Sequence, residues 1–179
     1  MMKAQLLVFV YFLPSAVIFG IPYYMLWSDT FSKDAFHNSI SFPGGWSTPA
    51  VIAVIMSAIV AHELLHGFTW GAFAEGGLKS IRYGVAWKFL TPYCHCTEPL
   101  TVKHYIAGAA MPGIILGVLP AIVSIITGNI VLFVFGMFMI FSAGGDFMII
   151  NKLRREGSGN FVQDHPSKIG CFIFRPEQQ

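Results

Sequence analysis

The chain has 179 residues, of which 55% are hydrophobic and only 11% are charged. Soluble domains carry roughly 25% charged residues, so this composition excludes an ordinary soluble domain and indicates that lipid solvates much of the surface. The net charge of +2 is too small to indicate a nucleic-acid partner. Three cysteines, an odd number, argue against a disulfide-stapled fold and fit reduced thiols on a cytoplasmic face.

Four segments are apolar over the roughly 20 residues that a helix needs to cross a hydrocarbon core of about 30 Å. They lie at about residues 4–27, 49–74, 105–127 and 130–150. The first is too long for the apolar region of a signal peptide. We therefore expect an all-α membrane protein in which residues 1–151 form one domain with four transmembrane helices, followed by a cytoplasmic tail at 152–179.

A short β-segment is expected in the cytoplasmic-side loop between the second and third helices. Apolar side chains alternate there, as they do along a strand with one buried face, at Ile81, Tyr83, Val85, Trp87 and Phe89. Gly84 indicates a bend or bulge in this strand, and Thr91-Pro92 is expected to end it.

The positive charges lie almost entirely on one side of this predicted topology. Four spans place both termini and the 75–104 loop on the same side, and that side holds all but one of the 11 Lys and Arg residues, the exception being Lys33. Positive charge accumulates on the cytoplasmic side of membrane proteins. The N- and C-termini and the β-segment are therefore expected to be cytoplasmic.

Ionisable residues are nearly absent from the predicted spans, except for His62, Glu63 and His66 in the second and Asp146 in the fourth. An aspartate at the bilayer centre costs about 2.5–3.5 kcal/mol on insertion scales, so such groups turn inward and find partners. Glu63 and Asp146 are both acidic and cannot neutralise each other. A divalent cation would satisfy both acids and both histidines.

The residues at 62–66 read His-Glu-Leu-Leu-His. On a helix the two histidines are offset by about 40° and lie one turn apart, which suits two ligands of one tetrahedral zinc ion. Glu63 lies beside them, where it can accept a proton from a water molecule that zinc activates. The alternative interpretation is that these are buried polar residues that hydrogen-bond to neighbouring helices.

A catalytic zinc ion needs a third protein ligand and an open position. Thr69 and Ala72 occupy the positions where a metzincin would have glycine and histidine, which excludes that extension. Glu75 would lie about 220° round a continuous helix from His62 and is a poor candidate. Asp146 fits better, because counting about 1.5 Å per residue places it about 24 Å deep, between the two histidines at about 20 and 26 Å. An interhelical hydrogen bond is the alternative role for this aspartate.

Other polar residues on the cytoplasmic side carry weaker signals. Cys94-His95-Cys96 is a weak metal motif, because structural zinc sites usually supply a second pair of ligands. We interpret it as a loop segment near the site. His95, His104 and His165 could each stabilise an oxyanion, and the sequence does not choose among them.

The third helix carries small residues at one-turn spacing, at Ala109, Gly113 and Gly117. This pattern favours close packing against another helix. Pro112 lies among them and could open the helix near the site, and a substrate path is the alternative interpretation.

Four segments carry a family resemblance: His-Glu-Leu-Leu-His-Gly at 62–67, Tyr-Cys-His-Cys-Thr-Glu-Pro-Leu at 93–100, Ala-Gly-Gly-Asp at 143–146, and Asp-His-Pro-Ser-Lys-Ile-Gly-Cys at 164–171. The chain resembles the site-2-protease class of intramembrane zinc peptidases, and more closely a small bacterial family of putative zincin peptidases. The resemblance implies His62, His66 and Asp146 as zinc ligands and Glu63 as the general base. One departure is that Gly-Gly precedes Asp146, where site-2 proteases have a Leu-Asp-Gly motif.

We therefore expect a zinc metalloendopeptidase of the bacterial cell membrane that hydrolyses a peptide bond within or next to the bilayer, with its active site towards the cytoplasmic face. Its expected partners are the lipid bilayer and a membrane protein or peptide substrate. By the same resemblance, the 80–93 segment would hold that substrate by strand addition. The alternatives are a non-catalytic binding or regulatory module with a structural or vestigial metal site, and a small metal or proton transporter.

Overall fold

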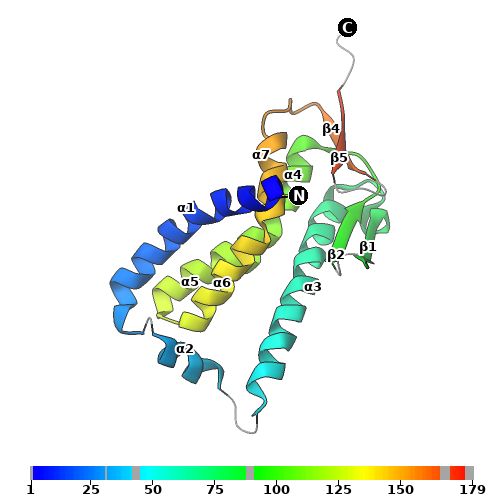
Figure 1. Ribbon diagram of the computed structural model, residues 1–179. Helices are drawn as coiled ribbons and strands as arrows, with labels where there is room; N and C mark the ends of the chain where they lie inside the picture. The colour runs from blue at the N-terminus through cyan, green and yellow to red at the C-terminus, as the bar shows by residue number, and fades with distance from the viewer. Residues whose placement is uncertain (1, 31, 42–44, 88–90, 166–169, 176–179) are drawn as a thin grey trace. The chain divides into compact units, whose positions relative to one another are not determined.

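The computed structural model describes residues 2–30, 32–41, 45–87, 91–165 and 170–175, and most of them are helical (Figure 1). In chain order the helical elements are α1 (Met2–Trp27), η1 (Ser28–Thr30), α2 (Lys33–Ile40), α3 (Ser47–Phe73), η3 (Gly77–Ser80), α4 (Val102–Pro112), the π-helix η4 (Gly113–Val118), α5 (Leu119–Thr127), α6 (Ile130–Ser142) and α7 (Gly144–Leu153). The strands are β1 (Ile81–Ala86), β2 (Thr91–Cys96), β3 (Leu100–Thr101), β4 (Phe161–Asp164) and β5 (Cys171–Phe174).

Within the described residues, three helices are long and apolar enough to cross a membrane, over Phe9–Trp27, Ser47–Phe73 and Val102–Thr127. The pair α6 and α7 qualifies as a fourth only if the two helices count as one span, because the chain bends by 48° between them. The expectation of apolar helices of membrane length is confirmed. The four-span topology and the sidedness of the termini stay predictions.

The chain divides into two compact units, of which the first comprises residues 1–58 and 113–145. In this unit α5 packs against α6, and α1 contacts both helices. Gly128 turns the chain between α5 and α6 with a φ of +70°, a conformation that other residues rarely adopt. Asn129 then caps α6 by accepting a backbone hydrogen bond at 2.9 Å. Tyr23 of α1 donates to the Gly128 carbonyl, also at 2.9 Å, and so ties α1 to this turn.

Glycines let α6 approach the preceding helix closely. A Cβ on Gly136 would lie 2.9 Å from the carbonyl oxygen of Gly117 and 2.8 Å from the amide nitrogen of Ala121, both on backbone. A larger residue at either glycine would push the two helices apart. The close helix contact that the spacing of small residues predicts is therefore confirmed at Gly117.

The second unit comprises residues 59–112 and 146–179. Its first sheet is an antiparallel hairpin of β1 and β2, paired from Ile81 opposite Cys96 to Ala86 opposite Thr91. The expected β-segment is thus present, but its first strand ends at Ala86, before Trp87, and pairing runs through Gly84 without a bulge. A Cβ on Gly84 would lie 2.5 Å from the ring of Tyr93 on the opposite strand. Glycine is needed there to make room for that ring.

Thr91-Pro92 begins a strand, although the sequence was expected to end one there. Residues 88–90, which include Phe89, lie outside the described part of the chain, and β2 starts immediately after them. In a hairpin of two strands each strand has one unpaired edge, so a proline that lacks an N–H costs no ladder hydrogen bond on that edge. The tertiary setting therefore overrides the usual meaning of proline as a terminator.

The other sheet of this unit has the strand order β3-β4-β5, with both pairs antiparallel. Two of its strands, β4 and β5, come from residues 152–179, the segment expected to form a cytoplasmic tail. Val162 of β4 and Leu100 of β3 face each other and are almost fully buried. They join a hydrophobic core whose other buried members are Trp70, Ile81, Cys96, Val102, Tyr105, Ala109 and Leu153.

Candidate metal centre

Helix α3 carries the two histidines of the 62–66 motif. After Pro49 the helix continues through alanine, valine, isoleucine, methionine and leucine with no glycine or proline before residue 67, which favours an uninterrupted helix. Both imidazoles are buried, with 9% of His62 and 5% of His66 exposed, and their ring centroids lie 4.9 Å apart. The structure brings the two rings together on one face of α3, one turn apart.

Asp146 lies in the first turn of α7 and faces both histidines. Its Oδ2 is 3.2 Å from Nε2 of His62, and its Oδ1 is 3.4 Å from Nε2 of His66. One ligand atom from each of the three residues lies within 4.8 Å of the other two. In the described part of the chain, no other group of three or more His, Cys, Asp or Glu side chains is this close together.

A backbone carbonyl fixes the orientation of His66. Its Nδ1 donates a hydrogen bond to the carbonyl of Gly108 in α4, at 2.9 Å. In the neutral ring Nε2 then carries no proton and presents its lone pair. That nitrogen faces Oδ1 of Asp146, which is also an acceptor. Two acceptors this close need a proton or a cation between them, and a metal-ligating histidine shows the same second hydrogen bond.

Pro112 leaves the carbonyl of Gly108 free for this contact. In an α-helix the carbonyl of residue 108 accepts from the amide of residue 112. Proline has no N–H, so Gly108 lacks its helical partner and is available to His66. The sequence indicated that Pro112 could open the third helix near the site. In the structure, Pro112 leaves the Gly108 carbonyl without a helical donor, and this carbonyl orients His66.

Two aromatic rings stack in series against His66. Trp70 lies nearly parallel to the imidazole, with centroids 5.0 Å apart, and Tyr105 stacks on Trp70 at 5.1 Å. Trp70 Nε1 donates to the Tyr105 carbonyl at 3.0 Å, and the Tyr105 hydroxyl donates to Asp164 of β4. A Cβ on Gly108 would lie 2.0 Å from Trp70 Nε1, so glycine is required for the stack to fit. These contacts hold the His66 ring in one orientation.

The donor set fits a zinc ion. Zinc binds histidine nitrogen and carboxylate oxygen at about 2.0–2.2 Å in a tetrahedron, and this geometry separates neighbouring ligand atoms by about 3.3–3.6 Å. The two nitrogen-to-oxygen separations of 3.2 and 3.4 Å are of that size. The His62 ring is held in place by fewer hydrogen bonds than the His66 ring, because its Nδ1 is buried without a hydrogen-bond partner among the described residues.

Glu63 lies beside the cluster and outside it. Its side chain is half-buried, and the backbone and the thiol of Cys94 in β2 lie close to its carboxylate. Because Glu63 is not one of the three possible ligands, its carboxylate oxygens are free to accept a proton.

The three histidines considered as oxyanion stabilisers have other contacts. His104 stacks on Phe73 at 4.1 Å, and His165 stacks on Phe172 at 4.9 Å. His95 follows Cys94 in β2, so its side chain points to the opposite face of the hairpin from the thiol that lies near the general-base candidate. No contact described for these rings reaches the metal cluster.

In the part of the chain that the structure describes, Cys94, His95 and Cys96 belong to no group of three or more possible metal ligands. Burial, with the nearby carboxylates of Glu63 and Asp164, raises the pKa of the Cys94 thiol to about 12. The interpretation of this segment as one that lies near the site agrees with the proximity of Cys94 to Glu63.

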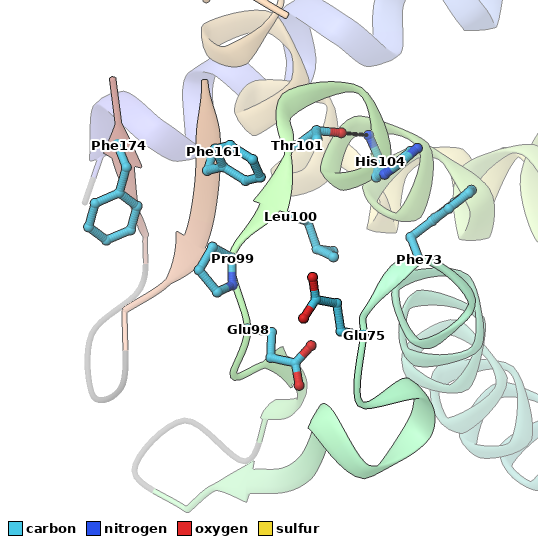
Figure 2. Close-up of a pocket in the computed structure, with 9 residues that line it drawn as sticks. All are labelled: Phe73, Glu75, Glu98, Pro99, Leu100, Thr101, His104, Phe161 and Phe174. Carbon is cyan, nitrogen blue, oxygen red and sulfur yellow. Dashed lines mark hydrogen bonds between the residues drawn. The ribbon is translucent and has the colours of Figure 1, made fainter. Parts of the chain in front are cut away.

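A cavity of about 640 Å³ lies where α3 ends and α4 begins (Figure 2). Its walls are mostly apolar, and the side chains of Glu75 and Glu98 lie among them. The carboxylate of Glu98 accepts hydrogen bonds from the Ser80 hydroxyl and the Gly76 amide, so it has a structural role in the turn after α3. Glu75, the poor candidate for the third ligand, belongs to this cavity and not to the metal cluster.

Fold and cluster together define a class of protein: a mostly helical chain with apolar helices of membrane length and a His-His-Asp group suited to one metal ion. The chain belongs to the family described as putative zincin peptidase, whose model matches residues 55–161, more than half of the chain. That match contains Glu63 and every member of the cluster. Family membership indicates a zinc metallopeptidase. Comparison with curated proteins and with solved structures finds no match.

Proposed function

We propose that this protein is an integral-membrane zinc metallopeptidase that hydrolyses a peptide bond within or next to the membrane. The observation that carries the proposal is the group of His62, His66 and Asp146, which lies in the segment matched by the zincin peptidase family. The two histidines are on a helix long and apolar enough to cross a membrane. In this proposal the three residues hold one Zn²⁺ and leave a position open for water and substrate.

Zinc at this site would acidify a water molecule and polarise the scissile carbonyl. Glu63 accepts the proton of the attacking water and donates it to the leaving amine nitrogen as the C–N bond breaks. Gly108 and Trp70 keep His66 aimed at the site throughout, because the carbonyl fixes its tautomer and the ring stack fixes its plane.

The β1–β2 hairpin offers a way to hold an extended substrate. Each strand of an isolated hairpin has an unpaired edge, and a peptide that adds to such an edge is bound by backbone hydrogen bonds. The backbone of Cys94 lies close to Glu63, so a strand added along β2 would pass beside the proposed general base. Asp164 closes one end of that edge, because it accepts a hydrogen bond from the Cys96 amide at 2.9 Å.

The proposed location is the bacterial cell membrane, with both termini and the open side of the site facing the cytoplasm. The support is the one-sided distribution of lysine and arginine along the sequence. The substrate would then be a membrane protein or peptide that becomes locally extended at the cytoplasmic surface.

A non-catalytic module with a structural metal site is the second candidate. The sequence around Asp146 favours it, since Gly-Gly precedes and Phe147 follows the aspartate where site-2 proteases have Leu-Asp-Gly. This difference in the residues around Asp146 affects how a substrate would be positioned, and it leaves the carboxylate of Asp146 available as a metal ligand. Metal content alone does not separate the two candidates, whereas cleavage does.

Removing the metal is expected to abolish cleavage reversibly. The full chain, purified in detergent and loaded with zinc, should cleave fluorescein-labelled casein or a single-span reporter peptide. Treatment with 1,10-phenanthroline should lower the rate to background, and added zinc should restore it. Cleavage that persists after zinc has been removed would contradict the proposal. A chain that binds zinc and cleaves neither probe would favour the non-catalytic module.

A further inference from the structure

Tyr83 of β1 places its hydroxyl over Gly67 of α3. A Cβ built on Gly67 would lie 2.0 Å from Oη of Tyr83 and 2.6 Å from its Cζ. The phenol therefore occupies the space in which any other residue at position 67 would carry its side chain. Ile81, two residues earlier and so on the same face of β1, reaches the same point at 2.8 Å. The alternation of β1 thus aims Tyr83 at α3.

This contact lies on the side of α3 that Glu63 occupies. Gly67 is one turn after Glu63, and residues four apart share a helix face. Each of these two residues is about 100° round the helix from the histidine that precedes it. In the hairpin, Tyr83 pairs with Cys94, whose backbone lies close to the Glu63 carboxylate. Tyr83 and Glu63 are therefore neighbours beside the metal cluster.

The Tyr83 hydroxyl is available as a hydrogen-bond donor. The side chain is 46% exposed, and its hydroxyl makes no hydrogen bond within the described residues. Burial of part of the ring, together with the nearby Cys94 and Glu63, raises the pKa of Tyr83 above its ordinary value. The phenol therefore keeps its proton at neutral pH, where it can stabilise a developing negative charge.

We propose that Tyr83 is a catalytic residue that donates a hydrogen bond to the oxygen of the scissile carbonyl as that oxygen becomes negatively charged. The inference rests on the proposed peptidase function. In the reaction, the water oxygen bonds to the carbonyl carbon and an electron pair moves onto the carbonyl oxygen. The C–N bond then breaks, and the water proton reaches the leaving nitrogen through Glu63. Tyr83 transfers no proton, and its hydrogen bond is strongest in the transition state.

The Tyr83→Phe variant removes one oxygen atom and keeps the ring that packs on Gly67. With the zinc-loaded full chain and labelled casein, kcat should fall by about 10²–10³-fold, the loss typical of a single oxyanion donor. KM, zinc content and melting temperature should stay at the wild-type values. Tyr93→Phe is the matched control. Tyr93 is 45% exposed and pairs with Gly84, the residue after Tyr83, so its side chain lies on the other face of the hairpin. The Tyr93→Phe variant should therefore keep wild-type kcat.

Two further measurements add a readout other than kcat and a second variant. N-phosphoryl-leucinamide carries charged oxygens that mimic the oxyanion, and Tyr83→Phe should weaken its binding by roughly 10–100-fold, the value of a hydrogen bond to a charged group. Gly67→Ala keeps the phenol but displaces its hydroxyl, so kcat should fall there too. The double variant should be no slower than the slower single variant, because both changes remove the same interaction.

Wild-type kcat and wild-type affinity for N-phosphoryl-leucinamide in Tyr83→Phe would overturn the role of Tyr83 and leave the peptidase proposal intact. Loss of zinc in that variant would also overturn it, since it would show a structural role. A wild-type chain that neither cleaves the two probes nor binds N-phosphoryl-leucinamide would overturn both proposals.

Discussion

Replacing Glu63 with glutamine is expected to leave zinc bound and to slow peptide cleavage by about 10²–10⁴-fold, the contribution typical of a general base. Glutamine keeps the size of the side chain and its contacts near Cys94, but its amide cannot accept the proton of the attacking water. Zinc content should not change, because Glu63 is not a member of the ligand cluster. Zinc analysis and the casein assay on one preparation measure both effects.

Glu75→Gln is the control for this experiment. Glu75 follows the end of α3 and lies in the cavity of Figure 2, away from the cluster, so the same chemical change there should leave cleavage at the wild-type rate. Undiminished cleavage in Glu63→Gln would remove Glu63 from the mechanism. Loss of zinc in that variant would show that Glu63 belongs to the ligand set.

Replacing His66 with alanine is expected to weaken zinc binding by more than about 100-fold. Removing only the hydrogen-bond partner of a metal ligand costs roughly 10–100-fold in affinity, and this change removes the ligand itself. It also leaves the Gly108 carbonyl and the face of Trp70 without their partner. In the metal-free chain, His62→Ala should lower the free energy of unfolding less than His66→Ala does, because the Nδ1 of His62 makes no hydrogen bond within the described residues. Isothermal titration of the full chain with zinc measures the affinity.

His104→Ala provides the matched comparison for His66→Ala. His104 is on α4 in the same unit and stacks on Phe73, and it is not a member of the cluster. Its replacement should leave zinc affinity within a few-fold of wild type. Equal affinity in His66→Ala and wild type would contradict the assignment of His66 as a ligand.

The long helices could be predicted from the sequence because each is an apolar run of membrane length, a signal that depends only on neighbouring residues. The sheet of β3, β4 and β5 could not. Its strands have two to four residues, and β3 pairs with a strand about 60 positions later, where Leu100 faces Val162. Segments this short carry too few alternations to reveal a period. Pro92 was misread for a related reason, since only the pairing partner decides whether a proline can join a strand.

At the metal centre, the ligand residues could be predicted from the sequence, because ionisable side chains are rare in apolar helices of membrane length. The spacing of His62 and His66 predicted a shared face, and a depth count suggested Asp146. The residues that orient His66 were missed. Trp70 resembles any other apolar residue of the span, and the Gly108 carbonyl is a backbone group that no side-chain pattern reveals. Pro112 was the one available signal, because a proline removes the partner of the carbonyl four residues earlier.

X-ray absorption spectroscopy of the zinc-loaded full chain tests most directly whether His62, His66 and Asp146 hold the metal. We expect one zinc ion per chain, with nitrogen and oxygen neighbours at about 2.0–2.1 Å, the outer-shell scattering of two imidazoles, and no sulfur. A sulfur shell at about 2.3 Å would contradict it, because the metal would then be bound by cysteine thiolates such as Cys94 and Cys96.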